Sequence, residues 1–198
     1  MTDADMALLA PAIQLRQLSL NYSSMGDEGM KQLAAFGQLE RLSLKGVKIT
    51  DTGLTHLKDM RHLWQLELND TKIGDVGVAK LVDLPNLRAL DLSDTRVTDD
   101  GLRPLRSLRT RCTLDLCGDA ITDEGLAHLE AMPELRCVDL GGTKVSQAGV
   151  ERFRRLRPKC LCTSYGRLLG RPAAAPKPDD DPFAVKPDAA SEDPFSGP

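Results

Sequence analysis

The chain has 198 residues, a formal net charge of −3 and only 4% aromatic residues, so one aliphatic core is expected. The near-balanced charge gives no overall field that would attract nucleic acid. No apolar run approaches the roughly 20 residues of a membrane span, and the acidic start lacks the basic segment of a secretory signal.

Residues 1–14 have the pattern of half a repeat. Asp3, Met6 and Leu9 precede an equivalent Asp, Met and Leu by 24 residues, which predicts a short helical cap with Asp3 as its N-cap. No strand comes before Leu18–Leu20, so that strand is expected to have an open edge that invites pairing. Two alternatives follow: a homodimer through this edge, or a start that is the remnant of a longer array.

Residues 15–158 repeat one pattern every 24 residues, L-x-x-L-x-L-x-x-T-x-I/V-x-D-x-G-L-x-x-L-x-x-L. The six units begin at Leu15, Leu39, Leu63, Leu87, Arg111 and Leu135. A leucine pattern with a period of 20–29 residues is typical of a leucine-rich solenoid. The sequence therefore predicts an α/β, right-handed horseshoe of six repeats, with short parallel strands on the concave side and short helices on the convex side.

Each unit carries its own local signals. The alternation in Leu66-Glu67-Leu68 predicts a short strand with the leucines inward. Asp51 of T-D-x-G-L is expected to cap the helix that follows, and the spacing from Leu54 to Met60 keeps one face of that helix inward. Gly53 recurs in the other units, which indicates tight packing or a special φ angle.

The fifth unit departs from the pattern. Arg111 stands where other units have Leu, and we expect Cys112 to turn inward in its place. Asp119 stands where Thr71, Thr95 and Thr143 occur in other units. A buried unpaired charge is costly, so Asp119 is expected either to accept backbone N–H groups of the turn or to mark a locally relaxed repeat.

The end of the chain changes composition. Residues 159–169 predict a capping strand, and residues 170–198 are rich in Pro, Ala and Asp, which predicts a disordered tail. The tail contains two D-P-F motifs, Asp181-Pro182-Phe183 and Asp193-Pro194-Phe195. They are either docking peptides or a chance repetition in a biased segment.

The phrases ITDTGLTHL, VTDDGLRPL and ITDEGLAHL, with LSDTRV and LGGTKV, resemble bacterial leucine-rich repeat proteins of the planctomycete type. They are also similar to the repeats of eukaryotic F-box/leucine-rich-repeat proteins and of bacterial effectors that imitate them. The resemblance covers Asp3 to Pro158. The eukaryotic subtype usually has Cys or Asn where this chain has Thr71, and no F-box fits in the fourteen residues before Leu15.

Two groups of side chains are candidates for partner binding. One outward column contains Glu67, Asp91, Asp115 and Asp139, and adjacent strands lie about 4.8 Å apart, so these acids should form a ladder. Asp70 and Asp94 extend it along the rim. The alternative is an ordinary solvated strand face. Trp64 and Arg88, one column away, suit an interface anchor, unless Trp64 packs sideways over the rim.

No catalytic, cofactor or metal site is expected. The five cysteines lack the spacing of a zinc site, and we interpret them as reduced thiols of a cytoplasmic protein. The predicted function is a non-enzymatic scaffold that binds an unidentified, basic protein partner on its concave face, without nucleic acid or membrane. The alternative is a substrate-recognition subunit or effector in a ubiquitin-ligase-like (SCF-type) complex.

Overall fold

The computed structural model describes residues 1–163 of the chain. Seven short parallel strands form one sheet in sequence order, β1-β2-β3-β4-β5-β6-β7. The strands are β1 (Gln17–Ser19), β2 (Arg41–Ser43), β3 (Gln65–Glu67), β4 (Ala89–Asp91), β5 (Cys112–Asp115), β6 (Leu135–Asp139) and β7 (Leu161–Thr163). An element of helix separates each strand from the next, as the 24-residue pattern predicts.

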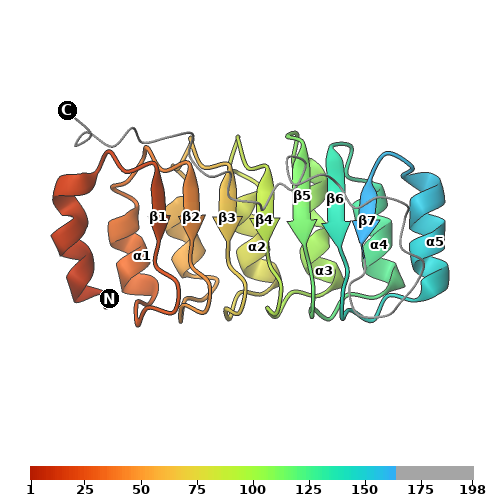
Figure 1. Cartoon of the computed structure of the whole chain (residues 1–198), viewed down its shortest axis with the longest axis horizontal. Coiled ribbons are helices and arrows are strands. Elements are labelled where there is room, and N and C mark those ends of the chain that lie inside the picture. Colours follow the sequence, from red (N-terminus) through yellow and green to blue (C-terminus); the bar gives the residue numbers. More distant parts are fainter. Residues whose placement is uncertain (164–198) are drawn as a thin grey trace, which may run out of the picture.

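The helices cover one face of the sheet and leave the other open, and the view in Figure 1 looks onto the open face. The α-helices are α1 (Asp27–Leu33), α2 (Asp75–Leu81), α3 (Asp99–Leu102), α4 (Asp123–Glu130) and α5 (Gln147–Leu156). The 3₁₀ helices are η1 (Ala4–Ala12), η2 (Gly53–Leu57) and η3 (Pro104–Ser107). We call the face without helices the concave face.

The leucines of the repeat fill the space between sheet and helices. Leu66 of β3, Leu68 directly after this strand, and Leu54 and Leu57 of η2 are all almost fully buried. The strand register continues this arrangement, since Leu42 pairs with Leu66 and Leu66 pairs with Leu90. Each repeat thus contributes one layer to a continuous aliphatic core, and the expected solenoid is confirmed.

The N-terminal end of the solenoid carries η1 (Figure 1). Met6 of η1 is buried and Leu9 packs against the core, as expected for a cap. Leu8 is 77% exposed on the same helix and Ile13 is 45% exposed. Within the described residues, β1 pairs with β2 and with no other strand. The open edge predicted for this strand is therefore present.

The aspartates of T-D-x-G-L do not cap their own helices, and this prediction was wrong. Asp51 accepts a hydrogen bond from the backbone N–H of Gly74, in the next repeat, at 2.7 Å. Asp3 likewise accepts from Gly26 and Gly29 at 2.7 and 2.9 Å. The bond joins residues 23 or more positions apart, so each aspartate ties its repeat to the next one rather than starting a helix.

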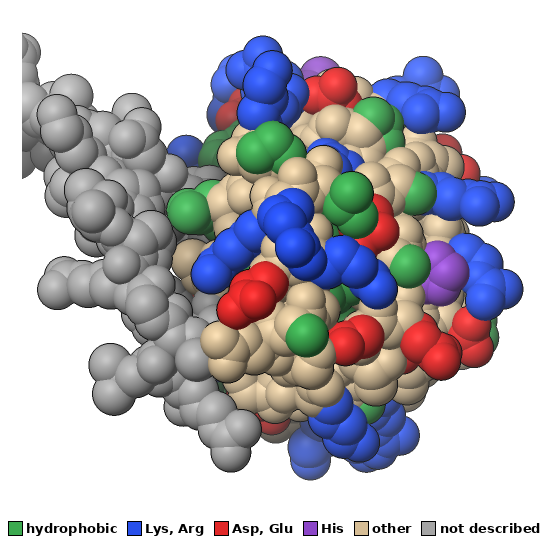
Figure 2. Space-filling model, turned by 90° about the vertical axis from the view of Figure 1, so that its right-hand side faces the viewer, with side chains coloured by type: hydrophobic (Ala, Val, Ile, Leu, Met, Phe, Trp, Pro, Cys, Tyr) green, Lys and Arg blue, Asp and Glu red, His purple; other side chains and the backbone are tan. Residues whose placement is uncertain are grey.

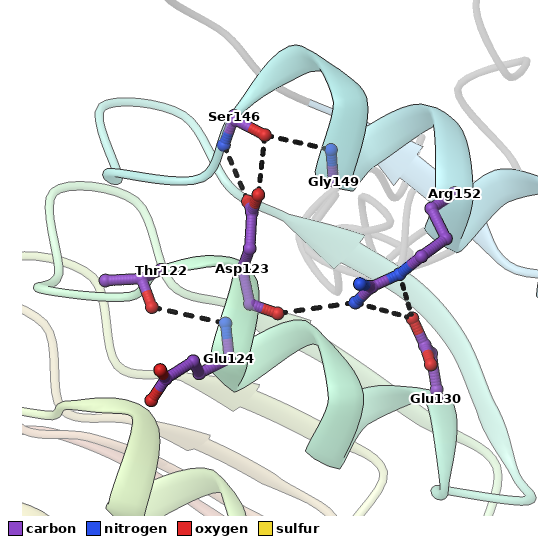
Figure 3. A network of polar contacts seen from close by, with 7 residues as sticks. All are labelled: Thr122, Asp123, Glu124, Glu130, Ser146, Gly149 and Arg152. Carbon is purple, nitrogen blue, oxygen red and sulfur yellow. Dashed lines mark hydrogen bonds and ion pairs between the residues drawn. The ribbon is translucent and has the colours of Figure 1, made fainter.

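Figure 3 shows the best-connected case of this link between repeats. Asp123 accepts from the N–H and the hydroxyl of Ser146 at 2.8 and 2.6 Å. The hydroxyls cap the helices instead: Thr122 accepts from Glu124 N–H, and Ser146 accepts from Gly149 N–H. In α4 and α5 the N-cap is thus Thr122 or Ser146, whose side chain reaches a free N–H group of the first turn.

The recurrent glycine is explained by the same link. A Cβ built at Gly77 would come within 2.4 Å of Oδ1 of Asp51, and one at Gly101 within 2.4 Å of Oδ1 of Asp75. Of the two explanations expected for this glycine, tight packing is the one observed. The glycines with positive φ stand elsewhere, at Gly46, Gly118 and Gly142.

In the fifth repeat, the residues that depart from the pattern are accommodated in the way the sequence predicts. Cys112 is buried in the missing leucine's place and Arg111 is exposed. The register between β5 and β6 shifts between Cys112 and Thr113, as a local bulge. Asp119 is 2% exposed, and its Oδ1 accepts from the N–H and hydroxyl of Thr95. Its Oδ2 has no hydrogen-bond partner among the described residues.

The C-terminal end of the described solenoid is formed by α5 and by β7, which follows it. Its arginines serve the fold: Arg157 donates to the carbonyls of Leu129 and Glu130 at the end of α4, and Arg154 donates to Cys162. Figure 2 shows Lys and Arg side chains spread over this end. The predicted disordered tail, with its motifs at 181–183 and 193–195, lies outside the described residues.

Candidate functional site

The acidic column on the concave face is assembled as its spacing predicts. The parallel register places one residue of each strand side by side across the sheet: Ser19, Ser43, Glu67, Asp91, Asp115, Asp139 and Thr163. The four acids are half-buried and occupy neighbouring strands from β3 to β6. We call these four residues the acidic column.

The aspartates of the column also have a local role. Asp91, Asp115 and Asp139 each accept the backbone N–H two residues further on, at 2.9 Å in all three cases. This bond closes the turn that follows the strand, as in an Asx-turn. It uses one carboxylate oxygen of each residue. The conformation of these side chains is therefore fixed before any partner arrives.

Glu67 is held differently, by side chains. The hydroxyl of Ser43 donates to its Oε2 at 2.5 Å, and the amide of Gln65 donates to its Oε1 at 2.9 Å. Gln65 lies in the adjacent outward column of the same strand and is itself buried. Glu67 is thus as well fixed as the three aspartates.

Burial raises the pKa of Asp91 above its ordinary value, and the hydrogen bonds from Ser93 oppose this rise. The neighbouring carboxylates of Asp115 and Glu67 add to the rise, because like charges on adjacent strands repel. The column therefore concentrates negative charge at a cost that falls on Asp91. A cation placed over it would relieve that repulsion.

Cys117 lies beside two members of the acidic column, Asp115 and Asp139. Burial raises the pKa of its thiol, and the adjacent carboxylates of Asp115 and Asp139 raise it further. The thiol is consequently a neutral donor beside two carboxylates rather than a nucleophile. The sequence analysis treated this cysteine only as one of five reduced thiols and missed its position beside the acids. The two-residue offset from Asp115 was the available signal.

The rim acids lie in a special backbone position. Asp70 and Asp94 have positive φ values of 57° and 55°. Their slot in the repeat is the one that holds Gly46, Gly118 and Gly142 elsewhere, where positive φ is free of strain. Tyr22, 65% exposed, occupies the same slot with φ 55°. Both aspartates are exposed and widen the negative surface beyond the acidic column.

Trp64 packs sideways rather than standing free. The guanidinium of Arg41 lies 4.7 Å from the centroid of the indole ring, which makes a cation–π contact. Trp64 is half-buried; its backbone N–H donates to the carbonyl of Glu40, and its carbonyl accepts from the N–H of Arg88, in the two neighbouring repeats. Arg88 is exposed next to it. Arg41 was not singled out from the sequence, although it lies one column from Trp64.

Two of the buried cysteines are held in the neutral thiol form. Burial raises the pKa of Cys112 and of Cys160 to about 12, so neither thiol ionises near neutral pH. Among residues 1–163, no group of three or more His, Cys, Asp or Glu side chains is placed to hold a metal ion. In that part of the chain, no helix is long and apolar enough to cross a bilayer.

Comparison with known proteins agrees with the geometry. A family model described as a leucine-rich repeat matches residues 14–34, 59–82 and 83–105. The chain is a leucine-rich-repeat solenoid. Comparison with curated proteins gave no significant match.

A solved structure with the same fold is the internalin InlF of Listeria monocytogenes str. 4b F2365, with a TM-score of 0.60 and 20% sequence identity. The superposition covers 80% of this chain and 50% of the internalin. The chain therefore spans about half the length of that protein, and the likeness concerns the fold.

Proposed function

We propose that the protein is a non-enzymatic interaction scaffold that binds a basic protein partner on its concave face. The observation that supports this most is the acidic column, in which four carboxylates stand on adjacent strands. The five ion pairs found among residues 1–163 involve none of the four. Their charge is available to a partner.

The scaffold would act through rigidity. The strands that carry the column are paired on both sides, and each carboxylate is already held by a hydrogen bond. A surface that is ordered before binding loses little conformational entropy when the partner arrives. Asp70 and Asp94 at the rim, and Trp64 and Arg88 at the opposite edge, would complete the contact surface.

An affinity pull-down tests this proposal. The double variant Asp91→Lys/Asp115→Lys should lose the partners that the wild-type protein retains. The control is Asp59→Lys/Asp83→Lys, which changes net charge equally at exposed residues outside the sheet. Retention of the same partners by the concave-face variant would contradict the proposal.

The ubiquitin-ligase alternative, like the cytoplasmic location and the docking role of the tail motifs, stays a prediction.

Self-association through β1 is supported by its open edge and by the exposed Leu8 and Ile13 beside it. Light scattering after size-exclusion chromatography should give twice the monomer mass. A Leu8→Glu/Ile13→Glu variant should then be monomeric, whereas a monomeric wild-type protein would rule the dimer out.

A further inference from the structure

The outer side of α5 is exposed and strongly basic. Residues 147–163 contain five Lys or Arg and one acid, a formal charge of +4. One side of α5 packs against α4, and the other side ends the described solenoid (Figure 1). Figure 2 looks onto this end, and Lys and Arg side chains gather across its middle. Within residues 1–163, no further repeat covers this positive surface.

Most of this charge has no carboxylate partner. Among the five ion pairs of residues 1–163, only that of Arg152 with Glu130 involves these cations. Arg154 and Arg157 donate to backbone carbonyls, which fixes the side chains but leaves their charge. The side chains of Arg155 and Lys159 are exposed and belong to none of the five pairs. An acidic partner therefore has the charge that this surface lacks.

An exposed apolar side chain lies among the arginines. Leu156 is 57% exposed at the C-terminal end of α5. Arg152 lies three positions before Arg155 and four before Leu156, and residues at these spacings are neighbours on a helix surface. We call Arg152, Arg155 and Leu156 the terminal patch. It offers two cations and one apolar contact within about one turn of helix.

The terminal patch does not have the chemistry by which repeats join. The linking aspartate recurs every 24 residues from Asp3 to Asp123, but the next such position holds Gln147. The amide of Gln147 donates to Glu151 of its own helix at 3.0 Å. α5 therefore lacks the carboxylate that binds the N–H groups of a following repeat. An acidic segment suits this face better than a second copy of the solenoid does.

The chain itself contains such a segment. Residues 172–198 have six acids and two lysines, a formal charge of −4. The first D-P-F motif, with the acid before it, is Asp180–Phe183, and Glu192–Phe195 repeats the pattern of two acids, Pro and Phe.

The length of chain before this segment allows it to reach the terminal patch. Asp180 follows Thr163 by 17 residues, and a chain of that length can extend to about 55 Å. The ten residues of α5 are only about 15 Å long. Because the segment is tethered, its effective concentration at the patch is on the order of millimolar. It therefore has an advantage over any acidic ligand that is free in solution.

We propose that the segment Asp180–Phe183 docks on the terminal patch of the same chain. Its carboxylates lie against Arg152 and Arg155, and Phe183 lies on Leu156. The second motif, Glu192–Phe195, has the same chemistry and competes for the same patch. A free acidic ligand has to displace this tethered segment before it can bind the basic end of the solenoid.

Carbodiimide cross-linking of the full-length protein tests this inference, because the reagent joins a carboxylate to an amine only where the two are in contact. Lys159, exposed three residues after Leu156, supplies the amine. Peptides from the monomeric product should contain Lys159 joined to an acid of residues 179–181 or 192–193. In Arg155→Glu the yield should fall about fivefold or more, because attraction becomes repulsion. In 1 M salt, where the screening length is about 3 Å, the yield of the wild-type protein should fall as well.

Two further variants separate docking from other effects. Arg106→Glu reverses an exposed cation of η3 that is also in none of the five ion pairs, and it should leave the yield unchanged. Phe183→Ser/Phe195→Ser keeps every charge and leaves the solenoid untouched, and it should lower the yield roughly threefold because the contact with Leu156 is lost. Equal yields in all variants, or no cross-link in the wild-type protein, would overturn the inference. A cross-link found only in dimers would also overturn it, since the segment would then come from a second copy.

Discussion

At the scale of single residues, Asp119 is the most consequential departure from the repeat. Burial is the main cause that raises its pKa to about 7, while the bonds from Thr95 oppose the rise. Asp119 is therefore protonated more readily in the folded chain than in the unfolded one. Stability should fall as the pH rises from about 4 through 7, because the folded protein must then hold a buried carboxylate with an orphaned Oδ2.

The variant Asp119→Asn should remove this pH dependence, since the amide keeps the acceptor for Thr95 but cannot ionise. Above pH 7 we expect it to be more stable than the wild-type protein by roughly 2–4 kcal/mol. Urea denaturation at pH 5 and pH 8 measures the difference. Asp94→Asn, in an exposed position, serves as the control. An unchanged slope in Asp119→Asn would show that another group titrates.

The glycine that faces the aspartate of the preceding repeat gives a second prediction for single residues. Gly77→Ala should destabilise the protein by about 1–3 kcal/mol, because a new Cβ would lie 2.4 Å from Oδ1 of Asp51. Gly37→Ala is the matched control, as nothing lies within 4 Å of its Cβ position. Thermal unfolding compares the two. Equal losses would mean that the backbone, and not Asp51, requires glycine at residue 77.

At the scale of elements, the link between repeats should be worth more than a helix-surface ion pair. Asp75 accepts from the N–H and hydroxyl of Thr98 at 2.8 and 2.7 Å. Asp75→Ala should cost roughly 1–3 kcal/mol, since both donors lose a charged acceptor. Asp100→Ala removes only an exposed pair with Arg103 and should cost under about 1 kcal/mol. Denaturation curves with similar midpoints for the two variants would refute the structural role of Asp75.

The hydrogen bond from each aspartate to the next repeat also shows which features of the elements cannot be predicted from local sequence. The period and its leucines predict strands, helices and register, because alternation and three-residue spacing are local properties. The partner of Asp51 lies in the next repeat, so a local capping rule assigned it wrongly. The inward turn of Cys112 was predicted, because a single missing leucine leaves a gap that one neighbour can fill, whereas the register shift beside it was not.

At the scale of the whole molecule, the candidate site follows from the period once one strand is placed. The acidic column was therefore found from the sequence. What the sequence could not provide is how each acid is held, or that Trp64 is covered by Arg41. Those contacts depend on side-chain conformations and on neighbours in adjacent repeats.

A solenoid whose repeats contact mainly their neighbours should tolerate the loss of one whole unit. Deleting residues 63–86 joins two equivalent positions, because Leu63 and Leu87 begin successive units, and the remaining strands keep their register. We expect this variant to fold cooperatively, with a lower midpoint and a smaller m-value, since one layer of core is gone. Deleting residues 63–82 instead breaks the register, shifts leucines out of the core and should abolish cooperative unfolding. Circular dichroism during urea titration separates the two. Equal behaviour of the two deletions would mean that stacking in register is not what holds the molecule together.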